Sequence, residues 1–68
     1  MKLSARNVLV SKVVEVVTGA VTSHVRLDVG GTIVTASITN EAVADLGLKV
    51  SDAAYAVVKA TDVMIGKD

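Results

Sequence analysis

Two adjacent glycines, Gly30 and Gly31, separate two runs in which side chains of different polarity alternate. In the run "AVTSHVRLDV" at 20–29, mostly apolar side chains share one face and polar side chains share the other, because successive residues of a strand point to opposite faces. The two faces are Val21, Ser23, Val25, Leu27 and Val29 against Thr22, His24, Arg26 and Asp28. The second run, "TIVTASIT" at 32–39, begins directly after the glycines. Since primed turns need positive φ, the sequence predicts a tight antiparallel hairpin here.

A third strand and one helix flank this hairpin. The β-branched run "VLVSKVVEVV" at 8–17 predicts a strand, and "TG" at 18–19 predicts the turn that follows it. After the hairpin the period changes, and "TNEAVADLGL" at 39–48 predicts one short helix. Asn40 is the expected N-cap of this helix, and Gly47 suits the left-handed position at its C-terminus.

The order of the predicted elements indicates a fold class. A last strand is expected at 53–61, and "DVMI" at 62–65 continues it after a bend. The order β-β-β-α-β-β favours a mostly β fold, a small five-stranded OB-like barrel with one short helix between the third and fourth strands. The alternative is a small α+β sandwich built from two chains. Residues 1–68 are expected to form a single domain.

The composition indicates that this domain associates with other copies of the chain. The chain has 68 residues, no Cys and one His, which leaves no disulfide and no His pair for a metal. It also lacks Phe and Trp, yet 51% of its residues are hydrophobic and its mean hydropathy is +0.60. A monomer of this size hides so much apolar surface poorly. Small folds are usually stabilised by disulfides, a structural metal or a partner chain. Because the first two are absent here, we expect a tight homo-oligomer.

Charge argues against several partners. Seven cations balance seven anions, so no broad basic surface for nucleic acid or an anionic membrane is expected. Tyr55 is the only aromatic residue, which is too few for stacking bases on an OB barrel. No apolar run approaches the roughly 20 residues of a transmembrane helix, and no signal peptide is predicted. These features fit a cytoplasmic protein.

Catalytic residues are scarce. His24 lies on the polar face of its predicted strand beside Arg26, where an exposed surface histidine is the expected interpretation. No carboxylate pair or Ser-His-Asp arrangement has supporting context. The sequence therefore predicts no enzyme.

Four hydrogen-bond donors stand at opposite ends of the chain: Ser4, Arg6, Lys59 and Thr61. Ser4 and Arg6 are two apart, as are Lys59 and Thr61, so each pair points the same way from an extended segment. If the first and last strands, or those of two chains, lie side by side, the four donors converge. Such a pocket suits a small tetrahedral dianion. The alternative is that Arg6 and Lys59 are solvated, or are paired with Glu15, Asp62 or Asp68.

Three blocks of sequence resemble the Mop (molbindin) family of molybdate-binding proteins. They are "SARN" at 4–7, "SITNEAVADLGL" at 37–48 and "AVVKATDVMI" at 56–65, and the resemblance spans residues 2–66. It implies an OB-like barrel that assembles as a hexamer, a trimer of dimers. It also implies that molybdate or tungstate is bound between subunits and buffered in the cytoplasm.

The resemblance also implies which residues hold the ligand. The main pocket would use the side chains of Ser4, Arg6 and Lys59, with backbone N–H groups near Ala5 and Ala60. Many relatives carry Ser directly after that Lys, so Ala60 removes one side-chain donor, for which Thr61 or a water would compensate. This departure keeps a rival open, an assembly module of the same fold that binds no ligand.

A second kind of pocket is implied around "GAVTSH" at 19–24. Its candidates are Gly19, Ala20, Val21, Thr22 and His24, although a turn explains these residues as well.

Overall fold

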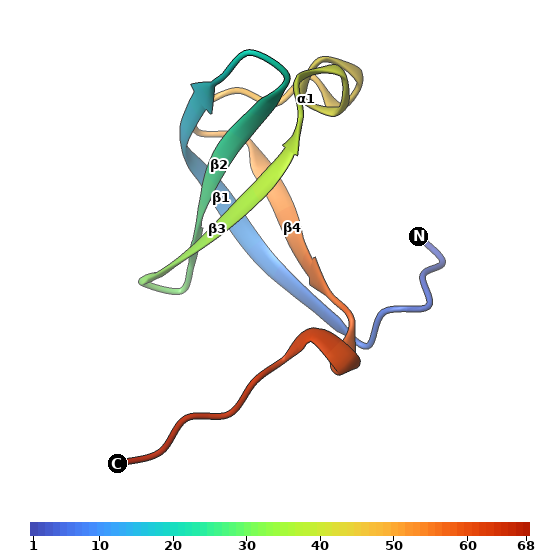
Figure 1. Cartoon of the computed structure of the whole chain (residues 1–68), viewed down its shortest axis with the longest axis vertical. Coiled ribbons are helices and arrows are strands. Elements are labelled where there is room, and N and C mark those ends of the chain that lie inside the picture. The colour runs from blue at the N-terminus through green and yellow to red at the C-terminus, as the bar shows by residue number, and fades with distance from the viewer.

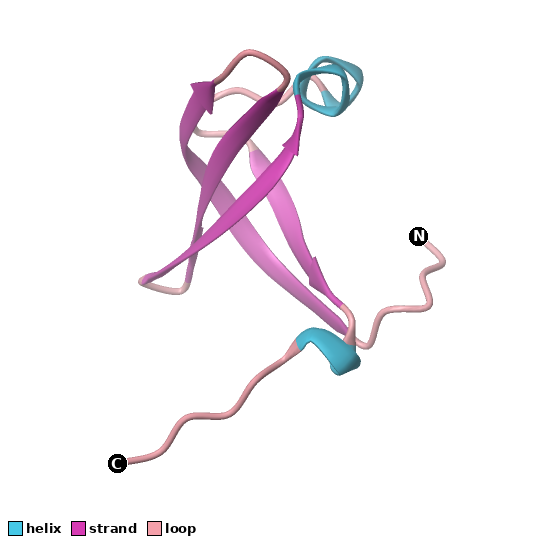
Figure 2. Ribbon diagram, in the orientation of Figure 1, coloured by secondary structure: helices cyan, strands magenta, loops and turns pink.

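A computed structural model describes the whole chain, residues 1–68, as one curled antiparallel sheet with a short helix at one end (Figures 1 and 2). The elements are β1 (Asn7–Thr18), β2 (Thr22–Val29), β3 (Thr32–Thr39), α1 (Asn40–Leu46), β4 (Ala53–Val58) and the 3₁₀ turn η1 (Ala60–Asp62). The strand order is β3-β2-β1-β4. The mostly β class is therefore confirmed, and neither helical segment is long and apolar enough to cross a membrane.

The predicted hairpin is confirmed as β2 and β3. Val29 lies opposite Thr32, and the two residues between them, Gly30 and Gly31, have φ of 59° and 96°. The Gly31 N–H also donates to Asp28 Oδ1 at 2.7 Å. Because a side chain rarely tolerates positive φ at two successive positions, the glycines fix this turn.

The long strand β1 connects the two halves of the sheet. Its first half, up to Lys12, pairs with β4, and its second half, from Lys12, pairs with β2. A β-bulge lies between Val13 and Glu15, directly after the residue that both partners share. A bulge bends and twists its strand, so the sheet curls at this point. The curl brings β3 and β4, the two outer strands, toward the same hollow (Figure 2).

The core on the concave side is small. Four apolar residues are buried, Val13, Val25, Leu27 and Ala56. Two serines are buried beside them, and each is hydrogen-bonded: Ser11 Oγ to the Ala54 carbonyl at 3.0 Å and Ser23 Oγ to Asn40 Oδ1 at 2.5 Å. A buried hydroxyl without a partner would be costly, so these bonds are needed.

The helix differs from the prediction at its start. Thr39 is the N-cap, since its hydroxyl accepts the Ala42 N–H at 3.0 Å, and the assignment of Asn40 as the cap is wrong. Asn40 is instead the first helical residue, and tertiary hydrogen bonds occupy its side chain. The predicted end is confirmed, because Gly47 has φ of 62° and closes the helix in the left-handed conformation.

The sheet has four strands, where five were expected. The last strand ends at Val58, not at residue 61, because its partner β1 begins at Asn7, opposite Val58. Residues 60–62 form η1, and residues 63–65 join no strand of their own chain. The sheet of a single chain is therefore open between β3 and β4.

Candidate functional site

The ladder between β1 and β4 brings the two cations of the predicted pocket to one end of the sheet. Its last pair is Asn7 opposite Val58, so Arg6 directly precedes β1 and Lys59 directly follows β4 at this end of the ladder. The Asn7 side chain fastens this end, because its amide donates to the Val58 carbonyl at 3.1 Å. Figure 1 shows the N-terminal segment and η1 leaving the sheet from this same end.

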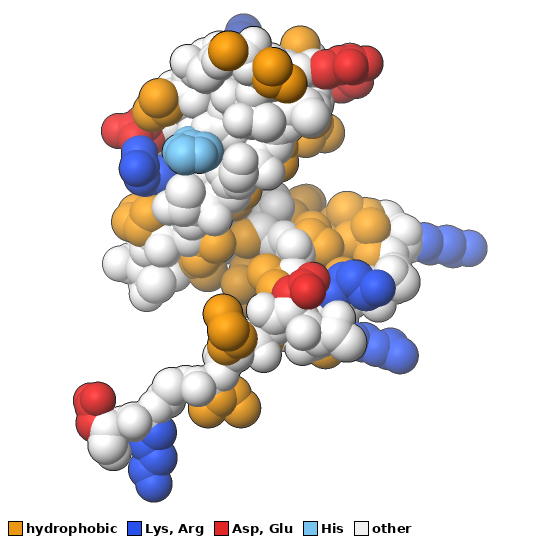
Figure 3. Space-filling model, viewed as in Figure 1, with side chains coloured by type: hydrophobic (Ala, Val, Ile, Leu, Met, Phe, Trp, Pro, Cys, Tyr) orange, Lys and Arg blue, Asp and Glu red, His pale blue; other side chains and the backbone are white.

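This end of the molecule is basic. The segments 1–6 and 59–62 contain three cations, Lys2, Arg6 and Lys59, against one carboxylate, Asp62, in a chain whose net charge is zero. Figure 3 shows Lys and Arg side chains gathered where these segments lie. A local surplus of positive charge attracts an anion.

Arg6 and Lys59 are exposed and form no ion pair in the structure. The predicted alternative partner Glu15 is taken by Arg26, opposite it on β2, in the only ion pair of the chain. Pairing with Asp62 or Asp68 does not occur either. Both cations therefore remain available to a ligand.

The other four predicted residues of the main pocket lie further from the β1–β4 ladder than Arg6 and Lys59 do. Ser4 is exposed and Ala5 half-buried in the segment before β1, while Ala60 and Thr61 belong to η1. The expectation that Lys59 and Thr61 project from one extended strand is therefore wrong. None of the six predicted residues lines either of the two hollows in the chain, so in one chain they form an open surface.

A shallow hollow of about 290 Å³ lies at the second predicted pocket. Val17, Gly19, Thr22 and His24 line it. Three of the five candidates thus come together, whereas Ala20 and Val21 do not line the hollow. His24 is exposed on β2, opposite Val17 on β1, as expected for a residue on the polar face.

Asn40 holds the turn beside this hollow, a role that its sequence context does not reveal. Its backbone N–H donates to the Val21 carbonyl at 2.8 Å, and its side-chain amide donates to the Gly19 carbonyl at 3.0 Å. The Gly19 N–H closes the turn on the Thr22 carbonyl at 2.9 Å. That N–H is consequently not free for an anion, while the N–H groups of Ala20 and Val21 have no acceptor within the chain.

Replacing Gly19 with alanine is expected to lower the free energy of unfolding by about 1–3 kcal/mol. A Cβ at this position would lie 2.7 Å from the Thr22 carbonyl oxygen, which the Gly19 N–H already binds, so the turn must open. Urea denaturation followed by circular dichroism measures the loss. Gly66→Ala is the matched control, because a Cβ there meets no atom within 4 Å. Equal stabilities of the two variants would contradict the tight turn.

The curled sheet and its basic, unpaired end define a small β domain suited to binding an anion. A TOBE domain is matched over residues 3–65. The probable molybdenum-pterin-binding protein of Haemophilus influenzae is 45% identical, over 97% of this chain and 97% of its own length. The chain therefore belongs to the TOBE domain family, and its resemblance to Mop proteins is confirmed.

Solved structures agree with this assignment. A molybdate-binding protein from Sporomusa ovata superimposes with a TM-score of 0.94 at 43% identity, covering 98% of this chain and all of its own. The cytoplasmic molybdate-binding protein ModG, with molybdate bound, superimposes with a TM-score of 0.84 at 51% identity. That alignment covers 88% of this chain and 43% of ModG, so ModG is the longer protein.

Proposed function

We propose that this protein binds molybdate or tungstate at sites between the subunits of a homo-oligomer, and so stores and buffers the oxyanion in the cytoplasm. The observation that carries the proposal is the position of Arg6 and Lys59. These cations come from opposite ends of the sequence, lie at the same end of the β1–β4 ladder, and have no carboxylate partner. The molybdate-binding relatives from Sporomusa ovata and ModG support the choice of ligand.

The chemistry of the donors explains why this ligand fits. Ser4, Arg6, Lys59 and Thr61, with nearby backbone N–H groups, supply hydrogen-bond donors, and molybdate at neutral pH is an unprotonated dianion that only accepts. Phosphate is partly protonated and needs an acceptor, which such a pocket lacks. Sulfate has the same charge but is smaller, so the size of the closed pocket must reject it. The metal keeps its own four oxygens, and no protein group is assigned as a direct metal ligand.

The proposed position between subunits follows from exposure. Ser4, Arg6, Lys59 and Thr61 are all exposed in one chain, where water would compete for every hydrogen bond. A second subunit over this end would exclude that water and strengthen each contact. We propose the hexameric assembly, a trimer of dimers, as the arrangement that provides it. The role is binding, with no catalytic residue and no cofactor assigned.

Calorimetric titration with molybdate, repeated in excess sulfate, tests the proposal. Saturable binding that sulfate does not displace is the expected result, and the stoichiometry counts the pockets. The rival function, a ligand-free assembly module, is suggested by Ala60, which offers no side-chain donor. An intact oligomer that releases no heat with molybdate would favour this rival and reject the storage role.

Replacing Ala60 with serine is expected to raise molybdate affinity about two- to tenfold. One added hydrogen bond from a neutral hydroxyl contributes about 0.5–1.5 kcal/mol. Ala60 is exposed in η1 directly after Lys59, so a hydroxyl there meets no steric obstacle within the chain. Titration of the variant against the unchanged protein measures the gain, and Ala20→Ser serves as a control away from this end. Unchanged affinity would mean that the residue 60 side chain does not face the ligand.

A further inference from the structure

Two side chains of β1 donate a hydrogen bond across the ladder to β4. Asn7 Nδ2 donates to the Val58 carbonyl at 3.1 Å, and Ser11 Oγ donates to the Ala54 carbonyl at 3.0 Å. In each case the acceptor is the residue directly opposite the donor. The two bonds are therefore of the same kind and differ only in place, because Asn7 lies in the last pair beside the candidate site and Ser11 lies near the other end of the ladder.

The Asn7 bond holds the backbone on both sides of the candidate site. Asn7 directly follows Arg6, and Val58 directly precedes Lys59. The Val58 carbonyl and the Lys59 nitrogen belong to one planar peptide group, so a bond to that carbonyl fixes the direction in which the chain enters Lys59. The Asp62 N–H donates to the Lys59 carbonyl at 2.9 Å. The Lys59 backbone is thus held at both of its peptide groups.

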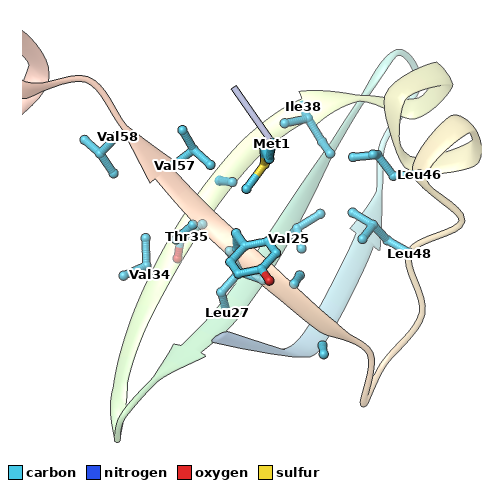
Figure 4. A pocket seen from close by; sticks show the side chains of 15 residues that line it. Met1, Val25, Leu27, Val34, Thr35, Ile38, Leu46, Leu48, Val57 and Val58 are labelled. Atoms are coloured by element: carbon cyan, nitrogen blue, oxygen red, sulfur yellow. The ribbon is translucent and has the colours of Figure 1, made fainter. Parts of the chain in front are cut away.

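Asn7 acts from the core side of the ladder. Along β1 it shares a face with Ser11, which is buried, because every second residue of a strand points the same way. Val58, opposite Asn7, lines an apolar groove of about 550 Å³ on the concave side of the sheet. Figure 4 shows the Val58 side chain at the end of β4, beside that of Val57. The half-buried Asn7 amide therefore acts on the exposed cations through the backbone.

We propose that Asn7 is the positioning residue of the anion site. Its hydrogen bond to Val58 sets the spacing of Arg6 and Lys59, and thereby the preference for molybdate over the smaller sulfate. The inference rests on the proposed function, since it concerns the same site. No ion pair holds the side chains of Arg6 and Lys59, so the backbone at their base is what limits where their donors lie.

A fixed spacing of the donors explains both affinity and selectivity. Donors that are already placed for the ligand lose less entropy on binding, and this raises affinity. A fixed frame also cannot close around a smaller tetrahedral anion, whereas a loose frame adjusts its donors to either anion. Loss of the Asn7 bond should therefore weaken molybdate binding and lower the ratio of the sulfate Kd to the molybdate Kd.

Calorimetric titration with molybdate, and competition by sulfate, test this role on three variants. Asn7→Ala should bind molybdate about two- to tenfold more weakly, the factor equivalent to one neutral hydrogen bond, with a lower Kd ratio. Asn7→Ser should restore both values, because the Ser11 hydroxyl already reaches the opposite carbonyl from this face of β1. Ser11→Ala loses the same kind of bond away from the site and should keep both values.

Two results of these titrations would overturn the proposal. One is an Asn7→Ala variant that matches Ser11→Ala in affinity and in Kd ratio, which would make the Asn7 bond a contribution to stability only. The other is an Asn7→Ser variant that restores neither value, since the hydrogen bond would then not be what matters.

Hydrogen exchange in the ligand-free protein gives a readout that does not need molybdate. The Asp62 N–H, held by the Lys59 carbonyl, should exchange faster in Asn7→Ala than in Ser11→Ala, with both rates scaled to the β2 amides to remove differences in global stability. Equal scaled rates would overturn the proposal. An unchanged protein that binds no molybdate would instead reject the proposed function, and exchange would still decide whether Asn7 holds Lys59 in place.

Discussion

Replacing Arg6 with alanine is expected to weaken molybdate binding about ten- to hundredfold. A hydrogen bond to a charged group contributes about 1.5–3 kcal/mol, and 1.4 kcal/mol is a factor of ten in affinity. Arg6 lies at the basic end of the β1–β4 ladder and has no carboxylate partner, so its charge is available to the dianion. Calorimetric titration of the purified variant measures the loss.

Arg26→Ala is the matched control for this loss. Arg26 is the other arginine of the chain; it is half-buried and pairs with Glu15 on the sheet, away from the N-terminal segment and η1. An exposed ion pair contributes little, so the control should fold and bind as the unchanged protein does. Both variants should keep the proposed assembly, because we expect apolar burial to drive it. Equal affinity of Arg6→Ala and Arg26→Ala would reject Arg6 as a ligand-binding residue.

The elements that local residues determine are the ones that sequence predicts well. Gly30 and Gly31 specify the β2–β3 turn because few other residues adopt their φ. Gly47 ends the helix for the same reason. The alternation at 20–29 correctly places Val25 and Leu27 on the buried face. Each of these features depends on neighbours in sequence only.

Tertiary contacts decide the features that sequence missed. Thr39 and Asn40 are both good N-cap residues, and the structure uses Thr39 because the Asn40 amide and N–H hold the turn that contains Gly19 and Val21. Asn7, which fastens β1 to β4 at Val58, had no predicted role either. Choosing between two equivalent residues requires knowing what lies opposite them.

The position of Arg6 and Lys59 at one end of the sheet was predictable, whereas their role in binding stays a prediction. The convergence of Arg6 and Lys59 follows once the first and last strands are known to pair, and that pairing was the stated condition. The turn at 60–62 was not foreseen, since the valine-rich run before it masks where the ladder ends. The prediction of a fifth strand was wrong for a related reason. Residues 62–65 have strand character, but one chain offers them no partner that they reach.

Replacing Leu27 with alanine is expected to lower the free energy of unfolding by about 2–5 kcal/mol. Leu27 is 6% exposed and is one of only four buried apolar residues. It lies opposite Val13 on β1 and Val34 on β3, so it joins three strands at the centre of the sheet. A core this small has few neighbouring side chains that could move into the cavity left by the substitution. The loss is therefore a large fraction of the stability of a short chain.

Urea denaturation at one fixed chain concentration measures this effect, because the proposed assembly would add a concentration-dependent term to stability. Leu46→Ala is the matched control, since Leu46 is the same residue type but 69% exposed at the end of α1. Its substitution should cost well under half as much. If subunits instead bury Leu46 and carry most of the stability, the two variants would be equally destabilised. That result would move the main apolar core of this protein from the inside of each chain to the contacts between chains.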